Sequence, residues 1–361
     1  MPEYTKSEKA RYIGFNKGAL VSYNLFLKKI DKMQKRTVLF SRPNTLQFEP
    51  TTKCNLKCPL CESTIWDRKG KDMKFSDFKK IIDQFPYLTT LLLQGIGEPL
   101  LCKDFFEMID YCKLKKILVG ITSNGTLIDE EMAKKLVEHE IDYMIISIDG
   151  ATAETFEKTK VGAKFEDVIG NTVNLIKARG DRKKPKILFH FTGTKDNIHE
   201  LPQVVKLAKD IGVDVVEAQD THFWGDEMLK EKLIGNTMRQ EMVSSRKFAN
   251  EALILAKELG ISFDWLGTGG KKSLYSDTDM QMHADQVICK KMFRSCFITA
   301  DGYVTTCACS PDPRKLNFGN VLEQDFNTIW NSPKYVAFRK SRLEGKMPDF
   351  CNMCTVPHLN W

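Results

Sequence analysis

Short apolar segments alternate with longer charged segments of helical period from Thr45 onward, and this alternation is the strongest constraint on the fold. Strands are predicted at Thr45–Glu49, Thr89–Gln94, Ile117–Thr122, Tyr143–Ile148, Lys186–Phe191 and Val213–Glu217. Helices are predicted near Phe75–Gln84, Lys103–Lys113, Asp129–His139, Phe165–Arg179 and Leu201–Asp210. Such units join parallel strands through right-handed crossovers, which bury both faces of the sheet. The chain is therefore α/β, and a doubly wound sheet and a partial barrel fit equally well.

Further segments lie on either side of these units. Residues 11–40 carry apolar side chains at helical spacing and predict an amphipathic leader helix, which we expect to cover one end of the barrel rather than lie on a membrane surface. Residues 226–259 predict a largely helical connector, and Ile261–Trp265 a short strand. Residues 267–285 are rich in glycine and polar side chains and predict a loop.

Composition excludes several classes of protein. The chain has 361 residues, of which 42% are hydrophobic and 28% charged, so it can bury a core and divide into two or three domains. The net charge of +7 is spread along most of the chain, and we expect no nucleic-acid partner. No apolar run reaches the ~18 residues of a membrane span, and the N-terminus lacks an apolar signal core. We therefore expect a cytoplasmic protein.

The eleven cysteines divide into groups. Without a secretion signal a disulfide framework is not expected, because a reducing cytosol keeps thiols free and spaced clusters there usually bind metal. Cys102 and Cys112 have apolar helical or pre-helical neighbours and are predicted to be packed thiols. Seven others form an early and a late group, namely Cys54, Cys58 and Cys61, and then Cys289, Cys307, Cys351 and Cys354.

The early group places three thiols on a short loop directly after a predicted strand. Thiolates are the usual ligands of iron in clusters, and a 4Fe-4S cube normally takes four of them. Three ligands leave one iron open for a cofactor or substrate. A structural zinc site would need a fourth protein ligand, and no His or Cys follows Cys61 closely enough to complete one.

The spacing Cys54-x3-Cys58-x2-Cys61 resembles the signature of the radical S-adenosylmethionine (radical SAM) superfamily. The resemblance implies a partial (β/α)6 TIM-type barrel in which SAM chelates the open iron. Reductive cleavage of SAM then gives a 5′-deoxyadenosyl radical that abstracts hydrogen from a substrate. Leu60 departs from the family, which commonly has an aromatic residue there next to the adenine.

Four strand-end turns resemble the SAM contacts of the same family, and each taken alone would be only a polar turn. The resemblance implies that a Gly-x-Gly-Glu turn binds the SAM amino group and that the next turns bind its ribose and carboxylate. The last turn would contact the adenine or the methionine chain. The implied residues are Gly95, Gly97, Glu98, Ser123, Asn124, Ser147, Asp149 and Thr192. Their order agrees with the carboxyl-end rule for parallel strands and barrels.

The late group begins with a hairpin signal, since Asp301-Gly302 separates two short apolar runs. The hairpin brings Cys289 and Cys307 to one small sheet, and Cys351-x2-Cys354 is a chelating turn. Four thiolates in two pairs fit structural zinc and a 4Fe-4S cluster about equally on spacing alone.

The late pattern, with its Ile329-Trp-Asn331 helix, resembles the auxiliary-cluster domain called SPASM in its long form and Twitch in its short form. The resemblance implies a small α+β domain with one auxiliary 4Fe-4S cluster held by the four late cysteines. Cys296 is the reserve ligand, and Cys309 lies close enough to Cys307 to compete.

An auxiliary cluster can accept an electron after hydrogen abstraction if a base removes a proton. We expect an oxidoreductase that dehydrogenates a small molecule such as a sugar or cyclitol, supplied with electrons by flavodoxin or ferredoxin. Glu217, Asp220 and His222 follow the sixth strand and are the candidate bases, although each also fits a polar strand-end turn. The alternatives are a peptide-modifying radical SAM enzyme and a non-catalytic iron-sulfur electron carrier.

The predicted domains follow from these segments. They are an N-terminal helical leader at 1–44, the radical SAM partial barrel at 45–225, a helical connector and loop at 226–285, and the SPASM/Twitch domain at 286–361.

Overall fold

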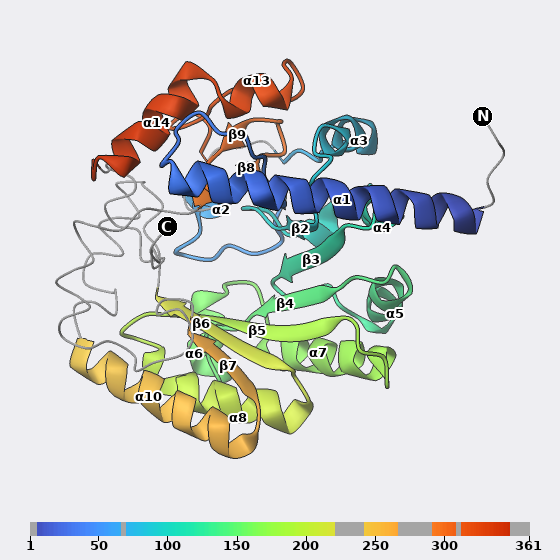
Figure 1. Ribbon diagram of the computed structural model, residues 1–361. Coiled ribbons are helices and arrows are strands. Elements are labelled where there is room, and N and C mark those ends of the chain that lie inside the picture. The colour runs from blue at the N-terminus through green and yellow to red at the C-terminus, as the bar shows by residue number, and fades with distance from the viewer. Residues whose placement is uncertain (1–5, 66–69, 221–241, 266–290, 308–311, 347–361) are drawn as a thin grey trace.

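The computed structural model describes residues 6–65, 70–220, 242–265, 291–307 and 312–346, and its core is one sheet (Figure 1). The sheet has nine strands in the order β7-β6-β5-β4-β3-β2-β1-β8-β9. All neighbouring pairs are parallel except β8 with β9. The strands are β1 Thr45–Phe48, β2 Thr90–Leu93, β3 Leu118–Ser123, β4 Tyr143–Ser147, β5 Lys186–Gly193, β6 Val215–Asp220, β7 Ser262–Trp265, β8 Ser295–Ile298 and β9 Val304–Thr305. The described strands β7 and β9 are the two edges, so the barrel is open.

Helices cover the outer face of this sheet (Figure 1). In the barrel they are α2 Glu62–Ile65, α3 Phe75–Asp83, α4 Phe105–Leu114, α5 Glu130–Glu138, α6 Ala153–Thr159, α7 Phe165–Arg179, α8 Leu201–Ile211 and α10 Met242–Leu259, with 3-10 turns η1 Pro99–Leu101 and η2 Ile198–Glu200. The leader helix is α1 Lys6–Met33, and the C-terminal part has α12 Lys291–Arg294, α13 Phe326–Trp330 and α14 Pro333–Leu343. Local sequence sets the ends: Asp129 accepts a hydrogen bond from Met132 N at the start of α5, and Gly212 ends α8 with φ 90°.

Side-chain alternation gives the strands an apolar outer face and a polar inner face. On β5, Phe189 and Phe191 are fully buried, while His190 and Thr192, which alternate with them, are half-buried. Successive side chains of a strand point to opposite faces. The phenylalanines therefore pack with the helices, and the polar side chains line the barrel interior.

All six predicted strands and five predicted barrel helices are present, and the expected partial barrel is confirmed. The sheet nevertheless crosses the predicted boundaries at residues 225 and 285. Strand β7 adds a seventh parallel strand beside β6, and β8 of the predicted C-terminal domain pairs with β1 in the register Thr45↔Ser295 and Phe48↔Ile298. A six-stranded open sheet would leave one edge of β1 unpaired, and the hairpin covers that edge.

The leader helix ends at Met33, earlier than the predicted residue 40. The carboxylate of Asp31 explains the end, because it accepts hydrogen bonds from Phe40 N at 3.0 Å and Ser41 N at 2.9 Å. These bonds turn the following chain back along the helix. Near the middle of α1, Lys17 Nζ donates to the carbonyls of Lys115 and Lys116 after α4. Lys17 thus ties the leader helix to the barrel, and Asp31 ties it to the segment that precedes β1.

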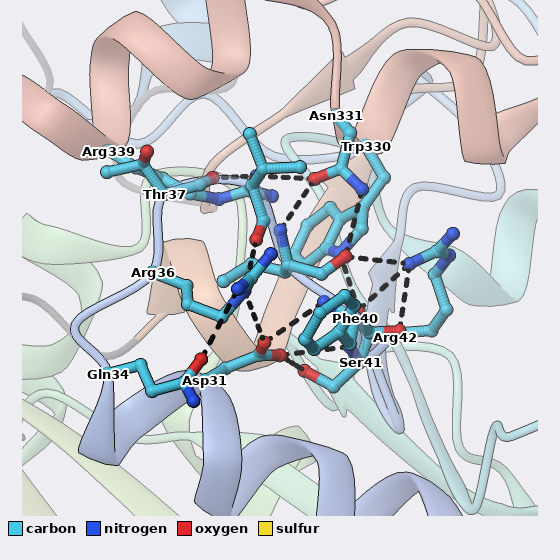
Figure 2. A network of polar contacts seen from close by, with 12 residues as sticks. Asp31, Gln34, Arg36, Thr37, Phe40, Ser41, Arg42, Trp330, Asn331 and Arg339 are labelled. Atoms are coloured by element: carbon cyan, nitrogen blue, oxygen red, sulfur yellow. Dashed lines mark hydrogen bonds and ion pairs between the residues drawn. The ribbon is translucent and has the colours of Figure 1, made fainter.

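Residues 37–42, which we call the leader strap, run beside the helices of the C-terminal part (Figure 2). Trp330 Nε1 donates to the Ser41 carbonyl at 2.9 Å. The Asn331 amide bonds to both backbone groups of Leu39, with Oδ1 accepting from the N–H and Nδ2 donating to the carbonyl, each at 2.9 Å. The predicted Ile-Trp-Asn helix is therefore α13, and its last residues bind the strap.

Arg339 on α14 completes this contact from the other side (Figure 2). Its guanidinium lies 4.2 Å from the ring centroids of both Trp330 and Tyr335. It donates to the Thr37 carbonyl at 3.0 Å and to the Met292 carbonyl at 3.1 Å. Burial lowers the pKa of Arg339 to about 10, so the side chain stays charged at neutral pH.

Candidate functional site

Three half-buried thiols lie on the loop after β1, which we call the cysteine loop (residues 50–61). A turn fixes its end, with Cys61 N donating to the Cys58 carbonyl at 3.1 Å. The pKa of Cys58 is raised to about 11, mainly by burial; Lys160 opposes the rise, and the neighbouring thiolates of Cys61 and Cys54 contribute to it. The three thiols are therefore close enough to interact electrostatically, as ligands of one cluster would.

The donor set fits a 4Fe-4S cluster with one open iron. No group of three or more His, Cys, Asp or Glu side chains within the described ranges converges on a single metal ion. Each thiolate of a cube binds a different iron, so its ligands spread more widely than those of one ion. Iron binding also removes the thiol protons that burial would otherwise retain. Three thiols on one loop therefore suit the cluster better than zinc.

Lys160, just after α6, pairs with Asp149 after β4. The distance between Nζ and Oδ2 is 2.7 Å, and only 16% and 10% of the two side chains are exposed. Burial disfavours the charged amine, but Asp149 and Cys58 outweigh it and raise the pKa of Lys160. A fixed positive charge thus lies beside the cysteine loop, where cluster thiolates carry negative charge. Lys160 could not be predicted from the sequence, since a single lysine in a helical segment gives no signal.

Residues Gly95–Glu98, which we call the SAM-side loop, pack directly against the cysteine loop. Glu98 N donates to the Lys53 carbonyl at 2.7 Å. A Cβ at Gly97 would lie 2.6 Å from that same carbonyl oxygen and closer still to that of Thr51. Only glycine allows this approach of two backbones. Gly97 is therefore needed for the two loops to pack together. Its predicted contact with SAM is a separate role.

Glu98 is buried, and protein donors occupy its carboxylate. Oε2 accepts from Asn124 N at 2.8 Å, Oε1 accepts from Leu100 N at 3.3 Å, and Ser123 also bonds to it. Burial raises the pKa of Glu98 to about 7 despite these bonds. The side chain joins the SAM-side loop to the end of β3, so its predicted contact with the SAM amine stays a prediction.

The end of β3 is in turn bonded to the cysteine loop. Asn124 Nδ2 donates to Asn55 Oδ1 at 2.9 Å, and Asn55 Nδ2 donates to Thr126 Oγ1 at 2.8 Å. Asn124 Oδ1 accepts from Thr126 N at 3.0 Å. Two of the predicted cofactor residues, Ser123 and Asn124, thus lie within one network around the cysteines.

The predicted residues after β4 and β5 are also bonded to each other. Asp149 Oδ1 accepts from Thr192 N at 2.9 Å, so its two oxygens contact β5 and Lys160. Asn197 Nδ2 donates to the carbonyls of Asp149 and Thr192 at 3.1 and 3.0 Å. This arrangement orients the carboxyl ends of both strands toward the cysteine loop.

Four polar side chains form a row across the inner face, which we call the lumen row. Sheet register places Ser147 beside His190, His190 beside Glu217, and Glu217 beside Asp264. His190 Nδ1 lies 3.8 Å from Glu217 Oε2. Burial and the Glu217 charge raise the pKa of Asp264. Proton-transferring groups therefore occur together in the barrel interior.

The lumen row contains one of the three predicted bases. Glu217 belongs to it, Asp220 ends β6 with its side chain outside the described part, and His222 lies outside the described residues. His190 and Asp264 were missed, although the alternation of His190 with buried phenylalanines was a signal for the inner face. Ser147, which was predicted to contact the cofactor, also lies in this row, beside His190.

The auxiliary cysteines are only partly within the described structure. Cys307 follows β9 and is half-buried, and its Sγ accepts from Thr306 Oγ1 at 3.8 Å. Cys296 lies on β8 next to Leu46, where burial strongly raises the pKa of its thiol. This apolar position disfavours a thiolate and argues against Cys296 as a ligand of the auxiliary cluster. The predicted ligands Cys289, Cys351 and Cys354, and the competitor Cys309, lie outside the described residues.

The two thiols expected to be packed are buried in the core. Cys102 and Cys112 are 5% and 0% exposed, and burial raises the pKa of each to about 12. Both predictions are confirmed.

Family models match both parts of the chain. The radical SAM superfamily matches residues 48–208, and the SPASM iron-sulfur cluster-binding domain matches residues 289–355. The chain therefore belongs to the radical SAM superfamily and carries a SPASM domain. It is an enzyme that uses SAM and a 4Fe-4S cluster, with further iron-sulfur binding in the SPASM domain. Among the helices that the structure describes, none is long and apolar enough to span a membrane.

Three similar proteins illustrate the range of relatives. The tungsten-containing aldehyde ferredoxin oxidoreductase cofactor-modifying protein of Pyrococcus furiosus is 25% identical, covering 81% of this chain and 82% of its own length. The PqqA peptide cyclase of Granulibacter bethesdensis is 24% identical, covering 88% and 81%. The structure of Streptococcus suis SuiB bound to S-adenosylmethionine has a TM-score of 0.63 at 17% identity, covering 90% and 75%, and shows the same fold.

Proposed function

We propose that this radical SAM enzyme modifies a peptide, forming a new bond or an altered residue at a carbon from which hydrogen has been removed. The observation that carries the proposal is the likeness to a PqqA peptide cyclase, which extends over 88% of the chain. Peptide modification, the alternative in the sequence analysis, now ranks above dehydrogenation of a sugar or cyclitol.

The chain's own residues fit the first half of such a reaction. When bound, SAM with the first cluster supplies a 5′-deoxyadenosyl radical, and the auxiliary cluster supplies an electron acceptor. Cys54, Cys58 and Cys61 would hold the first cluster, and the turns at Glu98, Ser123, Asn124, Asp149 and Thr192 would orient SAM above the barrel. Gly95 and Gly97 would allow the loops around it to pack closely.

The second half needs a base. Once a hydrogen atom has been removed, bond formation with oxidation releases one electron and one proton from the peptide. Glu217 is the proposed base, because it faces the interior beside His190 and Asp264. His190, whose Nδ1 lies 3.8 Å from Glu217 Oε2, can pass the proton onward. The auxiliary domain, with Cys289, Cys307, Cys351 and Cys354 as the proposed ligands, would take the electron.

The test uses the reconstituted full-length protein under anaerobic conditions, reduced by flavodoxin or ferredoxin. Synthetic peptides translated from the short reading frames next to its gene are compared with a panel of sugars and aminocyclitols. The expected result is 5′-deoxyadenosine formation stimulated by one peptide, together with a peptide mass change such as the loss of two hydrogens. Stimulation and oxidation of a cyclitol, with no peptide changed, would overturn the proposal. The Cys54→Ala, Cys58→Ala, Cys61→Ala variant is the control for radical-independent change.

A further inference from the structure

Glu49 lies between the two cluster-binding regions and contacts both. It directly follows β1 and is fully buried. Its Oε1 accepts from Ile96 N at 3.1 Å, and its Oε2 accepts from Ala300 N at 2.9 Å. Its own N–H donates to the Ile298 carbonyl at 2.9 Å. One residue thus bonds to segments that are 47 and 251 positions away in the chain.

The two partners belong to different functional regions. Ile96 lies in the SAM-side loop, between Gly95, which packs against Glu49, and Gly97, which packs against the cysteine loop. Ala300 lies in the turn between β8 and β9, and the chain runs from this turn through β9 to Cys307. In the other direction the backbone of Glu49 continues into the cysteine loop and reaches Cys54. Short stretches of chain therefore connect Glu49 to ligand positions of both predicted clusters.

The shape of the SAM-side loop is matched to the Glu49 side chain. A Cβ at Gly95 would lie 2.7 Å from the Glu49 Cβ and 2.9 Å from Oε1, closer than real contacts allow. Glycine at position 95 therefore makes room for this side chain. Because Gly95 has no side chain, the SAM-side loop can pack against Glu49 at the end of β1.

Buried, charge-assisted bonds make this the strongest described tie at the turn. A carboxylate that accepts backbone N–H groups away from water forms bonds about twice as strong as neutral ones. The neighbouring ion pair between Lys71 Nζ and Asp301 Oδ1 is 2.7 Å long, but its side chains are 57% and 32% exposed. Exposed pairs of this kind contribute about 0–1 kcal/mol. Of these two side-chain contacts to the turn, that of Glu49 is therefore the stronger.

We propose that Glu49 is a positioning residue that holds the SAM-side loop and the β8–β9 turn in one arrangement, so that the two clusters keep a constant separation and electrons pass between the auxiliary cluster and the substrate at a constant rate. The proposal is independent of whether the substrate is a peptide. It assigns to Glu49 no contact with SAM or substrate.

The test compares Glu49→Gln with the wild type as reconstituted full-length protein. Glutamine keeps the size but loses the charge, and its amide NH2 faces one of the two backbone donors. We expect at least tenfold faster hydrogen exchange at the amides of Ile96 and Ala300, with iron content unchanged. We also expect a broader distribution of the spin–spin coupling between the two reduced clusters. Product formed per 5′-deoxyadenosine should fall severalfold, whereas SAM cleavage without substrate should persist.

Glu200→Gln is the matched control. Glu200 is also buried, and its carboxylate accepts from the backbone N–H groups of Ala151 and Thr152 at 2.6 and 3.2 Å, but all of its partners are in the barrel. Its replacement should speed exchange at these two amides and leave the interaction between the clusters as in the wild type.

Two results would overturn the proposal. Unchanged exchange at Ala300 would show that Glu49 does not hold the turn. Faster exchange at both amides with an unchanged interaction between the clusters would reduce Glu49 to a structural tie. If Glu49→Gln does not fold, Gly95→Ala replaces it, because the added methyl displaces the Glu49 side chain while leaving its charge. The same exchange and magnetic measurements then decide.

Discussion

Lys160 and Asp149 form an ion pair beside the cysteine loop, with 2.7 Å between Nζ and Oδ2. The residue after Lys160 also contacts this loop, since Lys57 N donates to the Val161 carbonyl at 2.9 Å. The pair therefore joins the end of β4 to the segment that carries the first cysteines. Its two charges lie next to the thiols that would bind the cluster.

Replacing Lys160 by Met should reduce the free energy of unfolding by about 2–3 kcal/mol, because it leaves the Asp149 charge buried without its partner. Urea unfolding of the metal-free protein measures this loss. Lys164→Met is the matched control, since the ion pair of Lys164 with Glu157 has side-chain exposures of 71% and 32%. It should cost less than about 1 kcal/mol. Equal effects of the two variants would contradict the prediction.

Stability should fall with rising pH through the titration of Glu98. Its pKa is raised to about 7 from the ordinary 4.5, so the folded state keeps a proton that the unfolded state has lost. The stabilisation is complete below about pH 4.5 and is lost as the pH rises to about 7, a change of about 2–3 kcal/mol. Urea unfolding at several pH values should show this slope in the wild type and not in Glu98→Gln. A parallel slope in both proteins would argue against it.

Asn331→Ala should release the leader strap from α13. The change removes the partner of the Leu39 N–H and leaves the Leu39 carbonyl with only its bond from Arg42 Nη1, at a cost of about 1–3 kcal/mol in unfolding free energy. Hydrogen exchange should become faster in residues 37–42. Asn327→Ala is the control, because Asn327 accepts a bond from the half-buried Arg42 side chain and makes none to the backbone of the strap, so its loss should cost about 1 kcal/mol or less. If hydrogen exchange in the strap is as slow in Asn331→Ala as in the wild type, this contact does not hold the strap.

Iron content separates the two cysteine groups. The reconstituted wild type should hold about eight irons per chain, as expected for two 4Fe-4S clusters. Cys54→Ala, Cys58→Ala, Cys61→Ala should retain about four and lose SAM cleavage. Cys307→Ala should also retain about four but still cleave SAM. Cys296→Ala should keep about eight, because its thiol is packed beside Leu46, and a loss of four irons there would restore Cys296 as a ligand.

Glu217→Gln should slow product formation by about 10²–10⁴-fold while 5′-deoxyadenosine is still formed, because removal of a base leaves the radical step intact. Product and 5′-deoxyadenosine are quantified in the same reaction. Gln219→Asn is the control, since Gln219 lies two residues further along the same face of β6 and has no acid–base function. Equal losses of product and 5′-deoxyadenosine in Glu217→Gln would assign the residue to SAM binding instead.

The sequence by itself determined the cluster chemistry and the parallel architecture. Cysteine spacing and strand alternation are local properties, because three thiols on one loop and side chains of period two need no distant partner to be recognised. The strand at Thr45–Phe48 was predicted within one residue for this reason. The end of the leader helix was not, because Asp31 stops it through bonds to a segment that has already turned back.

Tertiary structure alone decided how the two cluster regions are joined. Strand β8 pairs with β1 across about 250 residues of sequence, which brings Ala300 within 2.9 Å of the Glu49 carboxylate. In the sequence Glu49 is only an acid before a proline, and Lys160, His190 and Asp264 are single polar residues with no spacing signal. Their roles depend on which strands become neighbours, and that is set by long-range strand pairing in the open sheet rather than by any local pattern.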